Sequence, residues 1–90
     1  MHAVVVSVSI TADADPQEVV THLQENVVPA VSQAPGFIAG YWVRLEGGDK
    51  GRATVVFESE DAARGAREMI QPAPGVTLES VDIGEVVANA

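Results

Sequence analysis

The stretch FESEDAA at residues 57–63 marks a change from a strand to a helix. Its phenylalanine ends a run of β-branched and small residues, which is typical of a strand. Ser59 can accept a hydrogen bond from the first unpaired amides of a helix, while Glu60 and Asp61 place negative charge near the positive end of that helix. The stretch therefore predicts that a strand leads directly into a helix at this point.

The stretch APGF at residues 34–37 marks the opposite change, from a helix to a strand. Apolar residues recur at helical spacing over residues 19–34, and Asp13 or Asp15 can cap the start of that helix. Pro29 lies inside the pattern and removes one backbone donor, so we expect a kink or a short break just before it. The proline and glycine of APGF then end the helix.

The remaining segments complete the order strand, helix, strand, strand, helix, strand. Strands are expected over residues 2–10, 37–45, 52–57 and 76–87, with a glycine-rich hairpin loop over residues 46–51. The second helix is expected to carry Met69 and Ile70 on its apolar side and to end at the stretch PAPG, residues 72–75. This order predicts an α+β, ferredoxin-like βαββαβ fold, a four-stranded antiparallel sheet with two helices on one face, in a single domain over residues 1–90.

The composition argues against several classes of function. The 90 residues include 13 Asp and Glu but only 5 Lys and Arg, so the net charge is −8. Nucleic acids and anionic membranes repel such a chain, and neither is expected as a partner. The absence of cysteine removes disulfides and thiolate metal sites. Because there is no basic leader and no apolar run near ~20 residues, a cytoplasmic protein is expected.

The sheet face opposite the helices is predicted to be apolar. Two helices cover only one face of a four-stranded sheet, yet both alternating sets of side chains in residues 3–10 and 52–57 include apolar members. An aliphatic surface of this extent is unfavourable on a small monomer. Two such sheets packed face to face would cover each other, so we expect a homodimer.

These motifs resemble those of a known superfamily. With APGF, the hairpin loop and FESEDAA, residues 2–87 look like a member of the dimeric α/β-barrel superfamily, which includes antibiotic biosynthesis monooxygenase-like proteins. The superfamily also contains haem-degrading enzymes, isomerases, dismutases and proteins with no assigned role, so the resemblance implies a fold more than a reaction. Members that degrade haem have a tryptophan at the position of Phe57 and a histidine about one helix length later. This chain offers Arg64, Arg67 and Glu68 there, so neither haem nor another cofactor is expected.

The resemblance also implies where a substrate would bind. Cofactor-free oxygenases of this kind hold an aromatic substrate between the sheet and the helices and use polar residues to ionise it. In this chain His22 is the candidate acid or base, because the ordinary pKa of an imidazole lies near neutrality. Asn26 lies one turn further along the same helix, and these two are the predicted catalytic residues. One histidine among scattered helical carboxylates makes a poor metal site, so no metal is expected.

Trp42, Arg44 and Phe57 are the predicted ligand-binding residues. Trp42 and its neighbour Tyr41 point to opposite faces of one strand. Trp42 would line the pocket beside a space left open by Gly40, and Arg44 on the same face could bind an anionic ligand. Tyr41 is grouped with an apolar set typical of a core, which consists of Phe37, Ala39 and Val43.

Three hypotheses for the function remain open at this point. The first is a small homodimeric protein, of unassigned activity, that binds a small apolar or aromatic molecule between its sheet and helices. The second is a cofactor-independent monooxygenase that acts on an aromatic or polyketide-like substrate. The third is a structural or regulatory dimer without a ligand. A cavity with a convergent polar group would favour the first two.

Overall fold

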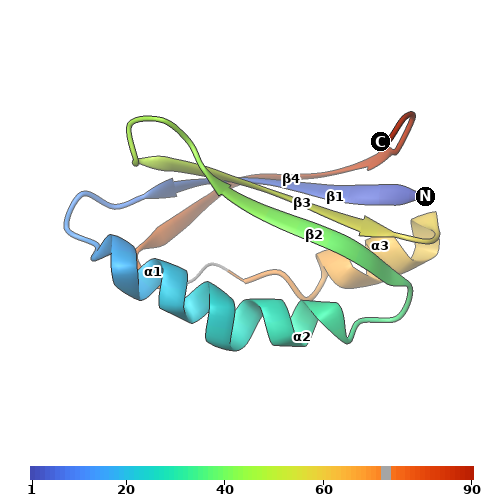
Figure 1. The fold of residues 1–90 in the computed structure, drawn as a ribbon, viewed down its shortest axis with the longest axis horizontal. Helices are drawn as coiled ribbons and strands as arrows, with labels where there is room; N and C mark the ends of the chain where they lie inside the picture. The colour runs from blue at the N-terminus through green and yellow to red at the C-terminus, as the bar shows by residue number, and fades with distance from the viewer. Residues whose placement is uncertain (72–73) are drawn as a thin grey trace.

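The computed structural model describes residues 1–71 and 74–90, and Figure 1 shows a single sheet with the helices on one side of it. The sheet order is β2-β3-β1-β4, and every neighbouring pair of strands is antiparallel. This is the ferredoxin-like α+β arrangement that the sequence predicts. The elements in chain order are β1 (His2–Ile10), α1 (Pro16–His22), η1 (Leu23–Val27), α2 (Val28–Ser32), β2 (Phe37–Arg44), β3 (Lys50–Phe57), α3 (Glu60–Arg67) and β4 (Val76–Glu85).

The first long helix is interrupted where the sequence predicts a break. Its cap is Asp15, whose side chain accepts a hydrogen bond from the amide of Gln17. Five residues ahead of α2 form η1, a π-helical segment in which the amide of Val28 donates to the carbonyl of Leu23. Because Pro29 has no amide hydrogen to offer to the preceding turn, wider π-type bonding replaces the ordinary α pattern there.

The two stretches that define the element order meet at one end of the sheet. Gly36 has φ +80°, and its carbonyl accepts a hydrogen bond of 2.8 Å from the amide of Glu58. A Cβ atom added to Gly36 would lie 2.8 Å from the Cβ atom of Ala62, so the chain passes too close to α3 for any larger residue. The rings of Phe37 and Phe57 then pack edge to face, with centroids 6.2 Å apart.

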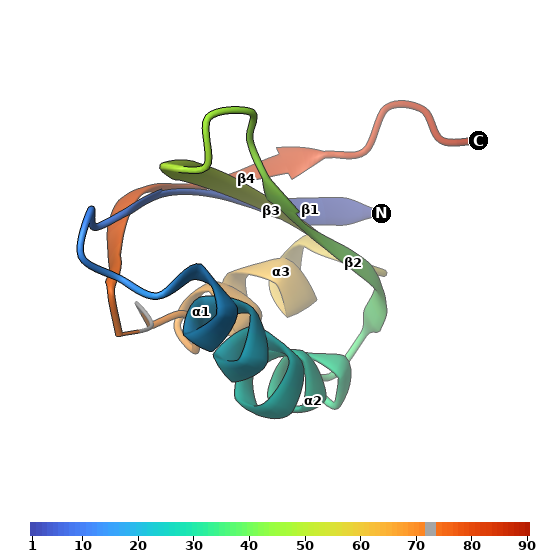
Figure 2. The same ribbon diagram turned by 60° about the vertical axis from the view of Figure 1, so that its left-hand side comes forward.

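The hydrophobic core lies between the sheet and α3, and it is centred on fully buried Phe57. Figure 2 shows α3 beneath the strands and the longer helical segment beside it. The buried residues of this core are Val4, Val6, Ala34, Ala53, Val55, Phe57, Ala63 and Ala66. Alanines on α3 let the helix approach the sheet closely, so the core is filled at the right-hand end of Figure 1, where α3 lies.

The second helix is shorter than predicted. Ser59 caps it as expected, accepting from the amide of Ala62 at 3.1 Å, but α3 ends at Arg67. Met69 follows in a turn with 52% of its surface exposed, so its assignment to the apolar core face of the helix was wrong. The amides of Met69 and Ile70 bond three residues back, which tightens the final turn instead of extending the helix. Of the predicted PAPG terminator, residues 72 and 73 lie outside the described part of the chain.

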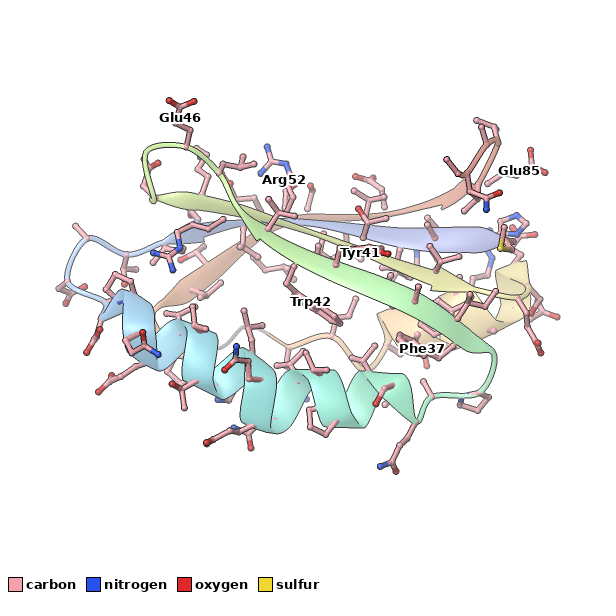
Figure 3. The ribbon with its side chains drawn as sticks, viewed as in Figure 1. Phe37, Tyr41, Trp42, Glu46, Arg52 and Glu85 are labelled. Carbon is pink, nitrogen blue, oxygen red and sulfur yellow. The ribbon has the colours of Figure 1, made fainter. Side chains whose placement is uncertain are left out.

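The aromatic residues of β2 divide differently from the prediction. Phe37 pairs with Phe57, but Ala39 pairs with Val56, so one extra residue is accommodated at Ile38. This irregularity puts Phe37 on the helix side together with Trp42, whose side chain lies between β2 and the helices in Figure 3. Tyr41 is 68% exposed on the opposite face, so the expectation that it packs in a core within one chain was wrong.

The face of the sheet opposite the helices carries exposed apolar side chains. Among them, Val5 is 36% exposed and Val43 is 52% exposed, next to Tyr41. In the described part of the chain, every helical segment lies on the other face, as both views show. No helix among the described residues is both long enough and apolar enough to cross a membrane.

Candidate functional site

A cavity of about 710 Å³ lies between the sheet and the long helical segment. All four strands, all three parts of that segment and residues 69–71 contribute to its wall, which consists mainly of valine, leucine and isoleucine side chains. Its size is typical of sites for drug-sized ligands. The polar residues among its described lining are His22, Gln24, Asn26, Arg44, Arg52 and Gln71.

His22 and Asn26 both line this cavity and contact each other. His22 is the last residue of α1 and is half-buried, and the Nδ2 atom of Asn26 lies 3.4 Å from its Nδ1 atom. An amide that donates to Nδ1 leaves Nε2 protonated as a donor, whereas an amide oxygen that accepts from Nδ1 leaves Nε2 unprotonated as a base. The Nε2 atom of His22 can therefore be either a proton donor or a proton acceptor.

Trp42 also lines the cavity, and its ring occupies the space that Gly40 leaves. A Cβ atom added to Gly40 would lie 2.9 Å from both Cη2 and Cζ3 of Trp42. The expectation of an open space beside Gly40 was therefore wrong, because the indole folds back over the glycine. Because Gly40 has no side chain, the ring of Trp42 can lie against the strand, where it forms part of the cavity wall.

Arg44 ends β2 and lines the cavity two residues beyond Trp42, on the same side of the strand. Its partner across the ladder is Gly51, whose missing side chain leaves room for Val8, since a Cβ atom added there would lie 3.1 Å from the Cγ2 atom of Val8. Phe57 differs from the other predicted site residues. It is 0% exposed, packs in the core, and is not among the residues that line this cavity.

The comparisons with known proteins define the family. The sequence pattern of the antibiotic biosynthesis monooxygenase family matches residues 1–69, which is more than half of the chain. The chain belongs to this family.

Solved structures of other proteins share this fold. One is the haem degrader MhuD from Mycobacterium tuberculosis with two haems bound, which is 21% identical with a TM-score of 0.70 over 100% of this chain and 99% of MhuD. Another is a variant of SnoaB, a cofactor-independent oxygenase from Streptomyces nogalater, which is 17% identical with a TM-score of 0.72 over 98% of this chain and 95% of SnoaB. At these identities the likeness shows the fold alone. A comparison with curated proteins found no match.

The haem-binding members raise the question of whether this family member has suitable haem ligands. The resemblance places an axial histidine near the end of the second helix, but α3 and the residues up to Gln71 contain none. The imidazole that lines the cavity comes from α1 instead, and it contacts Asn26. The ligand set therefore does not fit haem bound in the manner that the resemblance implies. No group of three or more His, Cys, Asp or Glu side chains among the described residues is placed to hold a metal ion.

Residues after α3 were missed as part of the site. Met69, Ile70 and Gln71 all line the cavity, and they lie beyond α3 because that helix ends early, at Arg67. Helical periodicity gave no sign of this, since it placed two of the three on a buried helix face. A signal was available in the following proline, which disfavours helical backbone at the residue before it.

Proposed function

We propose that this protein binds a small aromatic molecule in the cavity and oxidises it with O2 without a cofactor. The single observation that carries the proposal is an apolar cavity of about 710 Å³ whose lining includes one contacting imidazole–amide pair, His22 and Asn26. Membership of the antibiotic biosynthesis monooxygenase family supports it. Binding of a small ligand would be the first step of this function, and the proposal of binding does not depend on which reaction follows.

His22 is proposed as the general base. Its role would be to remove a proton from a ring CH2 or phenol, which leaves an electron-rich anion that can react with O2. In a balanced oxygenation the CH2 group becomes C=O, one atom of O2 enters the product and the other leaves as water. A positioned base contributes about 10²–10⁴-fold to the rate. Asn26 would orient the imidazole, and Trp42 would pack against the ring of the substrate.

The experiment measures O2 consumption with anthrone, a three-ring compound with one acidic CH2 group. We expect wild-type protein to consume one O2 for each anthraquinone formed, faster than in buffer. His22→Ala should lower the catalysed rate by about 10²-fold or more. His2→Ala is the matched control, since that histidine does not line the cavity. A rate equal to that in buffer, or an unchanged rate in His22→Ala, would refute the mechanism.

We also propose that two copies of the chain pack through the sheet face that carries Tyr41, Val43 and Val5. These side chains are exposed in the single chain, and a standard interface needs about 800 Å² from each partner. Sedimentation equilibrium at micromolar concentration should give twice the mass of one chain. Tyr41→Glu should shift the mass to that of one chain, whereas Gln33→Glu on the exposed end of α2 should not. A wild-type protein that sediments as a single chain would contradict this assembly.

A further inference from the structure

We propose that the ligand carries a carboxylate and that Arg44 binds this group at the edge of the cavity. The inference rests on the proposed function, because it assigns a chemical class to the molecule that the cavity holds. It follows from the distribution of charge around the cavity, from the position of Arg44 on β2 and from the absence of a carboxylate partner for Arg44 among the described residues.

The distribution of charge is unusual for so acidic a chain. Thirteen of its residues are Asp or Glu, yet none of the described residues that line the cavity is acidic. The groups there that carry or can gain positive charge are His22, Arg44 and Arg52. A carboxylate anywhere in this wall would repel an anionic ligand and would also pair with the arginines. The wall can therefore accept an anion although the protein as a whole is negatively charged.

Arg44 is placed to bind that anion, and Arg52 is not. Alternation along β2 puts Arg44 on the side of Trp42, which packs against the helix-facing core. Arg52 pairs with Val43 in the ladder and therefore points to the other face. Figure 3 shows the side chain of Arg52 above the sheet, away from the helices, and its Nη1 donates to the carbonyl of Gly51 at 3.0 Å.

Arg44 is also unpaired within the described part of the chain. Lys50 and Arg64 form ion pairs there, with Glu79 at 3.3 Å and Glu60 at 2.7 Å, whereas the side chain of Arg44 forms neither an ion pair nor a hydrogen bond with a described residue. Its guanidinium presents a planar fork of donors that matches the two oxygens of a carboxylate. A ligand with a planar apolar ring and a carboxylate could pack its ring against Trp42 and direct its carboxylate toward the guanidinium of Arg44.

Trp42 provides the readout for a binding experiment. It is the only tryptophan of the chain and it lines the cavity, so quenching of its fluorescence reports occupancy. The probes are anthracene-9-carboxylate and 9-anthracenemethanol, which share one ring system and differ in charge. We expect wild-type protein to bind the carboxylate about tenfold more tightly than the alcohol, in line with a hydrogen-bonded charge pair. This preference should decrease as salt is added, because salt screens exposed charges.

The variants separate a local contact from a change in net charge. Arg44→Gln should reduce the preference for the carboxylate over the alcohol to about twofold or less. Arg67→Gln removes the same charge from exposed α3 and should retain the full preference. Circular dichroism verifies that both variants are folded.

The outcomes distinguish this inference from the proposed function. If wild-type protein binds both probes equally, or if Arg44→Gln keeps the preference, then the carboxylate site is refuted while binding in the cavity stands. If neither probe quenches Trp42, both proposals are refuted. If the carboxylate is preferred and only Arg44→Gln loses the preference, the assignment of Arg44 is supported.

Discussion

Replacing Gly40 with alanine should displace the ring of Trp42 and destabilise the protein. The new Cβ atom would lie 2.9 Å from two ring carbons, which is about 0.6 Å inside the shortest optimal carbon–carbon separation. Overpacking of this kind costs about 1–3 kcal/mol. Replacing glycine with alanine also reduces the conformational entropy of the unfolded chain, and this offsets about 0.4–1 kcal/mol of that cost. Taking the middle of each range, the expected net loss in the free energy of unfolding is about 1.3 kcal/mol.

The assay is urea unfolding followed by circular dichroism, with Gly84→Ala as the matched control. Gly84 lies in β4, and nothing comes within 4 Å of a Cβ atom added there, so this variant should be neutral or slightly stabilised. Trp42→Phe shortens the ring that causes the clash, and the double variant should recover most of the loss. The emission spectrum of Trp42 should also change in Gly40→Ala. Stability equal to that of Gly84→Ala, together with an unchanged spectrum, would refute the packing argument.

Two further predictions concern α3. Ser59→Ala should lower the free energy of unfolding by about 1 kcal/mol, because the amide of Ala62 loses its hydrogen-bond acceptor. Ser59→Asp should retain most of the stability, since aspartate also caps helices. Equal free energies for the two variants in urea unfolding would contradict the role of the cap. The hydrogen bond from Arg64, and after it the positive charge of Arg64, hold the pKa of Glu60 below 4.5. The stability that this pair adds is therefore present above pH 4.5. It is lost as the pH falls through the lowered pKa of Glu60 in the folded state. In Arg64→Gln an NMR titration should show the pKa of Glu60 rising toward 4.5, and a pKa equal to that of the wild type would contradict the pair.

The order of elements could be predicted because it depends on local chemistry. A capping serine followed by acids, or a proline–glycine pair after an apolar helix, acts within a few residues of the chain. The contact between His22 and Asn26 was predictable for the same reason, since residues four apart on a helix are neighbours. The placement of Trp42 on the helix side of its strand was predictable from the alternation of side chains along that strand, and its side chain packs against the core there.

Other features depend on tertiary structure and were not predictable from periodicity. One extra residue at Ile38 reverses the side on which Phe37 lies relative to Tyr41, because side chains alternate with a period of two. The full burial of Phe57 requires α3 and Phe37 to close over it. The sequence pattern could place Phe57 on a strand but could not distinguish the wall of a cavity from the centre of a core.

The π-helical segment η1 bears on how this site could diverge among descendants of the same gene. A π turn is equivalent to one residue inserted into an α-helix, and η1 lies between His22 and α2. Deleting a single codon there would rewind the segment to ordinary α geometry and rotate His22 by about 100° relative to α2. One short deletion could thus turn the imidazole away from the cavity while the sheet and α3 stay as they are, so gain and loss of the proposed base are separated by one mutational event.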